Sequence, residues 1–202
     1  HVVSIGEKKS EILKVSRCSK IKFNVPDIWI KNFKWPLMND HKYKRGHVLV
    51  RSGPMPSTGA SRLAAISALR SGAGAVTLAS KTTALEVNAS HLTSVMLKEI
   101  NTEDEFFNFA KQKKINTLII GPGNGVDKKT KNIAIRAIKE EFGLILDADG
   151  LTSFEKNPKQ LFDLLKKRKK RDNVILTPHE GEFKRLFNFS NMDKIEKTRK
   201  AS

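Results

Sequence analysis

From His47 onward, short aliphatic or β-branched runs alternate with longer segments of helical periodicity, and this alternation limits the possible folds of the chain. The apolar runs lie at 47–52, 75–80, 92–97, 115–120, 144–147 and 173–177. Helical patterns lie between and after them at 58–71, 82–90, 103–113, 127–142, 158–170 and 180–187. Strands and helices that alternate in this way form a sheet with helices on its faces. The sequence therefore predicts an α/β fold with a mostly parallel central sheet.

The length and composition exclude several other classes of protein. A chain of 202 residues that is 39% hydrophobic can bury the core of one ordinary domain. Its single cysteine, Cys18, forms no internal disulfide, and no CxxC pair is present for a metal or for thiol exchange. The apolar runs are far shorter than a membrane span, and no secretory signal opens the chain. We therefore expect a cytoplasmic protein without a membrane partner.

The chain is strongly basic, with a formal net charge of +17. Its 38 basic residues comprise 28 lysines and 10 arginines, and the densest run, KKRKKR at 166–171, contains no aromatic residue. Proteins that bind nucleic acids rely on arginine and on aromatic side chains among the basic ones. We therefore do not expect a nucleic-acid partner, and we predict that the run at 166–171 is the solvated end of a helix.

A glycine-rich loop, GPGNG, follows the predicted strand at 115–120. Gly121, Gly123 and Gly125 let backbone N–H groups approach an anion, and the helix that follows presents the positive end of its dipole. The spacing matches neither the Rossmann nor the P-loop pattern. Two interpretations stay open, a phosphate or pyrophosphate site and a tight turn between strand and helix.

Two carboxylates, Asp147 and Asp149, follow the strand at 144–147. If the strand continues through them, their side chains point to the same side of the sheet. Such a pair can hold Mg²⁺, orient a ligand hydroxyl, or shift the pKa of one partner. The alternative is a helix N-cap beside a solvated acid.

Three further groups lie beside predicted strands. The sequence TPHEGE at 177–182 follows the run at 173–177, which places His179 over the same edge of the sheet as the two other loops. A basic cluster that includes Lys42 precedes the first strand and can contact phosphates. The small residues Gly59 and Ala60 open a helix and permit the close approach of a flat ligand or of a neighbouring strand.

Five motifs together resemble the NAD(P)H-hydrate dehydratase family, which has a ribokinase-like, three-layer α/β/α fold. They are HKYKRGHVLV (41–50), TGASRLAAISALRSGAGAVTLAS (58–80), LIIGPGNG (118–125), LILDADGL (144–151) and ILTPHEGEF (175–183). The resemblance implies a lyase that uses ADP or ATP, with Mg²⁺, to dehydrate the S epimer of hydrated NADH or NADPH. It assigns Ala60, Gly123 and His179 to the hydrated cofactor. Lys42, Gly121, Gly125, Asp147 and Asp149 become candidates for binding phosphates or orienting the ligand, and no protein metal ligand is assigned.

The resemblance also divides the chain. It implies an arm at 1–40 that includes the end of an epimerase-like domain (2–7), followed by a partial dehydratase domain at 41–202 that lacks its C-terminal part. We expect an epimerase domain in the same or a partner chain, and a homo-oligomer. The expected catalytic Asp lies beyond Ser202, so the catalytic residue is unknown and activity of the chain alone is open. The alternatives are a ribokinase-like kinase of a vitamin precursor and a degenerate, non-enzymatic fragment.

Overall fold

The computed structural model describes residues 24–33, 35–170, 173–189 and 192–202. The expectations for the segment 2–7, for Cys18 and for Arg171 lie outside these residues. The chain divides into two compact units, His1–Met38 and Asn39–Ser202. In the first unit, α2 (Pro26–Trp29) and the 3₁₀ turn η1 (Ile30–Asn32) contain no buried residue.

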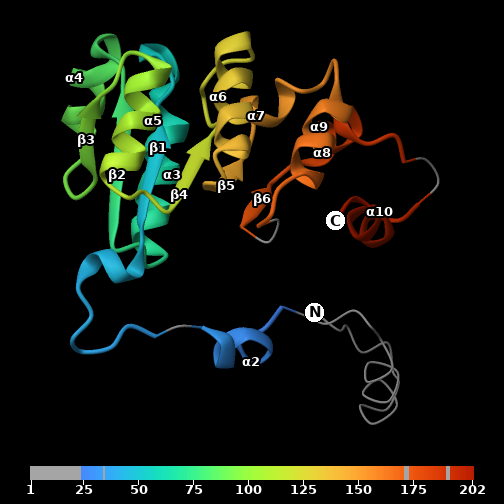
Figure 1. Cartoon of the computed structure of the whole chain (residues 1–202), viewed down its shortest axis with the longest axis horizontal. Coiled ribbons are helices and arrows are strands. Elements are labelled where there is room, and N and C mark those ends of the chain that lie inside the picture. Colours follow the sequence, from blue (N-terminus) through green and yellow to red (C-terminus); the bar gives the residue numbers. More distant parts are fainter. Residues whose placement is uncertain (1–23, 34, 171–172, 190–191) are drawn as a thin grey trace, which may run out of the picture. The chain divides into compact units, whose positions relative to one another are not determined.

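The second unit is built on a six-stranded sheet in which every pairing is parallel, in the order β3-β2-β1-β4-β5-β6 (Figure 1). The strands are β1 (His47–Arg51), β2 (Ala75–Ser80), β3 (Met96–Glu99), β4 (Thr117–Ile120), β5 (Gly143–Leu146) and β6 (Val174–Leu176). All six residues of β2 are buried, as expected for a strand covered on both faces. The prediction of an α/β fold with a parallel sheet is confirmed.

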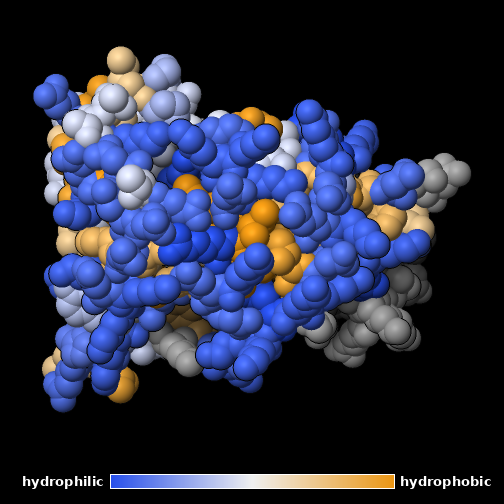
Figure 2. Space-filling model, turned by 45° about the horizontal axis from the view of Figure 1, so that its top comes forward, coloured by the Kyte–Doolittle hydropathy of each residue, from blue (hydrophilic) through white to orange (hydrophobic). Residues whose placement is uncertain are grey.

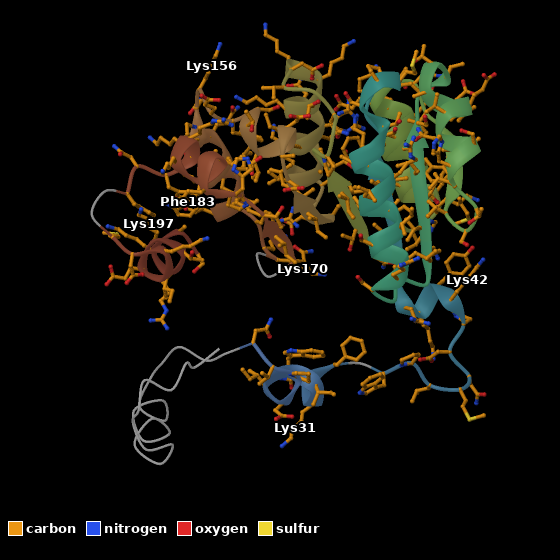
Figure 3. The ribbon with its side chains drawn as sticks, turned by 180° about the vertical axis from the view of Figure 1, so that it is seen from behind. Lys31, Lys42, Lys156, Lys170, Phe183 and Lys197 are labelled. Carbon is orange, nitrogen blue, oxygen red and sulfur yellow. The ribbon has the colours of Figure 1, made fainter. Side chains whose placement is uncertain are left out.

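Helices cover both faces of the sheet. The helices of this unit are α3 (Thr58–Arg70), α4 (Thr82–His91), α5 (Glu103–Gln112), α6 (Lys128–Lys139), α7 (Asp149–Thr152), α8 (Pro158–Lys166), α9 (Glu180–Leu186) and α10 (Lys194–Ala201), with 3₁₀ turns η2 (Lys42–Arg45) and η3 (Met55–Ser57). α10 contains no buried residue. Figures 1 and 3 view the sheet from opposite sides, with α5 in front of the strands in the first and α3 in front in the second. The start of α5 has a local cause, a capping box formed by Thr102 and Glu105.

Two apolar clusters hold the three layers together. Side chains that alternate along β1 enter opposite clusters, since Leu49 packs with α5, α6 and α8 while Val50 packs with α3. Phe107 and Phe154 are fully buried in the first cluster, and Ala65 of α3 is fully buried in the second. This packing fixes the strand ends, and with them the loops in which the candidate residues lie.

The structure corrects three local predictions. The strand expected within 92–97 is Met96–Glu99, because Leu92 ends α4 and Val95 packs into the core before pairing begins. The helix expected at 158–170 ends at Lys166, and the predicted solvated run is interrupted by Arg168, of which only 4% is exposed.

In the described part of the chain, no helix combines the length and the apolar character that crossing a bilayer requires.

Candidate functional site

The strand order has its topological switch point between β1 and β4, because the chain leaves β1 toward β2 and later returns on the other side of β1. In parallel α/β sheets, ligands bind outside the carboxyl ends of the strands at such a point. The loops that leave these two strands are 52–57 and 121–127. Figure 2 turns this end of the sheet toward the viewer, and hydrophilic side chains predominate on the face that it shows.

The loops after β1 and β4 touch through backbone atoms. A Cβ atom added to Gly53 would lie 2.0 Å from the carbonyl oxygen of Gly123, and one added to Gly123 would lie 2.3 Å from the carbonyl oxygen of Ser57. Gly123 also has a φ of +68°, which favours glycine. Ser57 is the N-cap of α3, and Ala60 is exposed in the first turn of that helix. Of the predicted substrate residues, Gly123 therefore forms this contact between the loops, and Ala60 lies three residues after its partner Ser57.

Asn124 holds this contact together, and sequence reasoning missed it. Its Oδ1 accepts the N–H of Gly121 at 2.9 Å, and its Nδ2 donates to the carbonyl oxygens of Arg51 at 3.0 Å and Pro122 at 3.2 Å. The side chain is buried, so each of these bonds forms away from water. The sequence signal was an asparagine within a glycine-rich loop, which often bonds nearby backbone in turns. Its burial and its bond to the distant Arg51 appear only in the folded chain.

The loops after β4 and β5 interlock in the same way. A Cβ atom added to Gly121, whose φ is +126°, would lie 1.7 Å from the carbonyl oxygen of Asp147. β5 ends at Leu146, Ala148 takes a φ of +45°, and Asp149 is the first residue of α7. The strand therefore does not continue through Asp147 and Asp149, because the chain turns sharply between them and becomes helical.

The two carboxylates reach different neighbours. Asp149 Oδ2 accepts the N–H of Gly125 at 2.8 Å, which joins it to the glycine loop. Asp147 Oδ1 accepts the hydroxyl of Thr177 at 2.7 Å, which joins it to the loop after β6. Among the described residues, the second oxygen of each carboxylate accepts no hydrogen bond, so both can accept hydroxyl or N–H groups of a ligand.

His179 has a local structural partner of its own. It is the N-cap of α9, and its Nδ1 accepts the N–H groups of Gly181 at 3.0 Å and Glu182 at 3.4 Å. Because Nδ1 accepts these bonds, the neutral ring carries its proton on Nε2. The imidazole is 67% exposed, with Nε2 at 3.2 Å from a carboxylate oxygen of Glu182. His179 can therefore cap α9 and still present an exposed ring face to a ligand.

A partly buried cation, Arg51, lies at the end of β1 and was not among the predicted residues. Its Nη1 donates to Thr130 Oγ1 of α6 at 3.0 Å, and within the described part of the chain no carboxylate lies within 4.0 Å. Burial lowers the pKa of Arg51 from its usual value, and the charges of Asp127 and Glu103 offset this only in part. A guanidinium held in this way carries positive charge to the edge of the glycine loop.

The predicted residues thus fall into two groups. Hydrogen bonds and packing bring together Gly121, Gly123, Gly125, Asp147 and Asp149, and His179 joins them through the loop that holds Thr177. Lys42 lies at the opposite end of the sheet, in the turn η2 before β1, where its carbonyl oxygen is 1.5 Å from the place of a Cβ on Gly74. Lys42 therefore does not share the carboxyl-end crevice with the others.

The described residues do not form a site of their own for the expected Mg²⁺. In the segments that the structure describes, no three His, Cys, Asp or Glu side chains are grouped so that they could hold an ion. Mg²⁺ that enters with a nucleotide is held largely by phosphate oxygens and water, with only one or two carboxylates from the protein. We therefore assign no metal ligand and derive no chemical step from a metal.

Comparisons with known proteins agree with this fold and identify a family. The family model described as NAD(P)H-hydrate dehydratase matches residues 48–202, the stretch that carries the strands from the second residue of β1 onward and the carboxyl-end loops. An ATP-dependent (S)-NAD(P)H-hydrate dehydratase of Pediculus humanus subsp. corporis is 37% identical over 165 residues, which cover 77% of this chain and 51% of the relative. A bifunctional NAD(P)H-hydrate repair enzyme of Coxiella burnetii is 31% identical over 150 residues, 74% of this chain and 28% of the relative.

Solved structures support the same architecture. A ribokinase-like protein from Enterococcus faecalis superposes with a TM-score of 0.70 at 19% identity, over 90% of this chain and 64% of that one. An ADP/ATP-dependent NAD(P)H-hydrate dehydratase from Bacillus subtilis, crystallised with ATP and Mg²⁺, gives 0.57 at 23% identity, over 77% and 52%. The chain spans about half the length of the monofunctional relatives and under a third of the Coxiella enzyme. With the family model matched over most of its length, the chain belongs to the NAD(P)H-hydrate dehydratase family.

Proposed function

We propose that the loops at the carboxyl end of the sheet bind hydrated NADH or NADPH, and that the chain supplies this part of a nucleotide-dependent dehydratase of the S epimer. The observation that carries the proposal is the contact between Gly53, Gly123 and Ser57 at the switch point, inside the stretch that the family model matches. Ala60, Gly123 and His179 would contact the hydrated cofactor. Curated relatives of the chain are named dehydratases or hydrate repair enzymes, which favours this function over a vitamin kinase.

The chemistry that this proposal implies has two steps. In the first step, the hydroxyl oxygen of the hydrated ring bonds to the terminal phosphorus of ADP or ATP. The bond between that phosphorus and the bridging oxygen breaks, and the hydroxyl proton passes to a base. Phosphate then leaves with the electron pair of its bond to the ring carbon, and the neighbouring carbon loses a proton, which restores the dihydronicotinamide.

The described residues would contribute binding and orientation to these steps. Arg51 and the first turn of α6 present positive charge beside the glycine loop, which suits the phosphates of a dinucleotide. The unused carboxylate oxygens of Asp147 and Asp149 are acceptors for ligand hydroxyls. We assign the catalytic base to none of these residues. We further propose that an epimerase domain accompanies the dehydratase, as it does in relatives named bifunctional, and that the assembly is a cytoplasmic homo-oligomer.

Binding and turnover are tested separately. Met55 is 56% exposed in the loop after β1, so its labelled methyl group reports on this site by NMR. We expect hydrated NADH to shift the Met55 signal in the unaltered chain and in Asp163→Asn, and to bind more weakly to Asp147→Asn. Asp163 is exposed on α8, away from these loops, and so controls for the loss of a charge. No shift at Met55 at saturating ligand would remove these loops from the binding site.

Turnover is measured as the return of reduced-nicotinamide absorbance from chemically hydrated NADH, with ADP or ATP present, omitted or exchanged. The louse relative serves as the positive control. Recovery that depends on a nucleotide would establish the activity for this chain. Binding at Met55 without recovery would limit the contribution of these residues to recognition of the hydrate.

A further inference from the structure

A pocket lies at the end of the sheet opposite the glycine loops. It has a volume of about 700 Å³, and its walls include His47 and Met96, the first residues of β1 and β3, and Asn116, which directly precedes β4. Small-molecule sites in proteins have volumes of roughly 300–1,000 Å³. The whole length of the parallel strands separates this pocket from the site proposed above, so its ligand is a separate question.

Apolar side chains form one side of the pocket. Leu97 of β3 and Phe109 of α5 line it, and both also pack partly against the core clusters, which holds them in place. Met96 and Tyr43 extend this surface and are 41% and 53% exposed. Fixed apolar walls with an exposed rim are suited to the flat or aliphatic body of a small organic molecule.

The charge of the pocket has a single sign. Lys98, Lys113 and Lys114 line it, and none of its eleven lining residues is acidic. Lys114 takes a φ of +50° in the turn that ends α5, a position at which glycine or asparagine is more common. A lysine on an edge strand such as β3 can also serve to prevent strand pairing, but that accounts for Lys98 alone.

A buried histidine in the wall has one nitrogen without a partner. Only 4% of His47 is exposed, and its Nε2 lies 2.8 Å from Thr77 Oγ1, while Nδ1 has no hydrogen-bond partner. Burial, followed by the nearby charges of Lys42 and Lys113, lowers the pKa of His47 below its ordinary value. Leaving a buried polar nitrogen without a partner is unfavourable, and such groups in native proteins call for an explanation.

We propose that this pocket binds a small organic anion with a flat apolar body, such as an aromatic carboxylate, sulfonate or phosphate ester. Its apolar part packs on Leu97 and Phe109. Its charged group lies among Lys98 and Lys113. There it can also accept a hydrogen bond from Nδ1 of His47, once that atom is uncovered, in the tautomer whose Nε2 accepts the Thr77 hydroxyl. The basic cluster before β1, which the carboxyl-end site does not use, lies at this end of the sheet, as the position of Lys42 in Figure 3 shows.

The test uses two probes with the same apolar body, anilinonaphthalene sulfonate, which is an anion, and phenylnaphthylamine, which is uncharged. The chain has four methionines, Met38, Met55, Met96 and Met192, and therefore four labelled methyl signals. We expect the anion to saturate a single site and to shift the Met96 signal while leaving Met55 and Met192 unchanged. We expect the uncharged probe to bind much more weakly.

Charge variants complete the experiment. Replacing Lys98 and Lys113 by Gln should weaken anion binding at least about tenfold, because charge-assisted contacts are lost. Replacing Lys139 and Lys156, which are exposed elsewhere on the unit, removes the same net charge and should leave the affinity unchanged. Equal binding of the two probes, an unmoved Met96 signal, or equal affinity in both double variants would each overturn the proposal. Since Met55 reports on the carboxyl-end loops, failure here is distinct from failure of the proposed function.

Discussion

The carboxylate of Asp149 accepts the backbone N–H of Gly125 at 2.8 Å, although 24 residues separate them in the sequence. The bond links the glycine loop after β4 to the first residue of α7, so each loop positions the other. Ala148, directly before Asp149, has a φ of +45°. A residue with a side chain takes this conformation at an energetic cost, and the neighbouring bonds stabilise it.

Removing that carboxylate should free the glycine loop. In Asp149→Ala we expect the Gly125 amide to exchange its hydrogen about fivefold faster, the equivalent of ~1 kcal/mol for one hydrogen bond. Asp149→Asn keeps an oxygen acceptor and should retain most of the protection. Hydrogen exchange followed by NMR measures both variants. Unchanged exchange in Asp149→Ala would show that other contacts hold the loop.

Asn124 should be important for stability, since it is buried and bonds three backbone groups. Asn124→Ala leaves the N–H of Gly121 and the carbonyl of Arg51 without their partner, which should lower the free energy of unfolding by about 2–4 kcal/mol. Asn132→Ala removes an exposed asparagine from α6 and is the control. Urea unfolding compares the variants, and similar midpoints for both would contradict this role.

The sequence allowed the strands and the site edge to be predicted because these follow from local patterns. The run at 75–80 is β2 without change, and glycines and carboxylates after strands must gather at one edge of a parallel sheet. The roles of Asn124 and Arg51 were not foreseen, because they depend on which loops become neighbours after folding. The sharp turn at Ala148 was missed for a similar reason, as alanine carries no local signal for a positive φ.

Ala65 tests the packing of α3 against the sheet. The residue is fully buried beside Val50 and Leu78, so Ala65→Leu introduces volume where no space exists. We expect a loss of about 1–3 kcal/mol in the free energy of unfolding. Ser67→Leu places the same side chain on the exposed side of the helix and should cost far less. Calorimetry compares the free energy of unfolding of the two variants. Equal stability would show that the packing around Ala65 deforms to accept the larger side chain.

His47 should make the stability depend on pH. Its pKa in the folded chain is lowered by burial and then by Lys42 and Lys113, so the folded state binds fewer protons than the unfolded state below about pH 6.5. This contribution is complete above the unfolded pKa and is lost as the pH falls through the folded value. We expect His47→Gln to flatten the fall in stability between about pH 7 and 5, and the exposed His91→Gln to leave it unchanged. If the stability of the unaltered chain, His47→Gln and His91→Gln falls equally as the pH is lowered, His47 is not the group responsible.

Arg168 acts as an internal brace, with its guanidinium donating to the carbonyl oxygens of Ile138 at 2.7 Å and Phe142 at 2.8 Å, and to Asn173 Oδ1 at 2.8 Å. These bonds satisfy the end of α6 and join it to the start of β6. Arg168→Met should therefore lower the free energy of unfolding by about 2–4 kcal/mol, because buried acceptors lose their donors. Arg70→Met, at an exposed position on α3, should change it little.

Arg168→Lys separates charge from geometry. A lysine keeps the positive charge but lacks the planar fork that reaches several carbonyl groups at once. If the fork is the stabilising feature, denaturant unfolding should place Arg168→Lys close to Arg168→Met. Burial lowers the pKa of Arg168, and the charge of Glu141 offsets this only in part. Full stability of Arg168→Lys would instead show that one donor is enough to hold the end of α6.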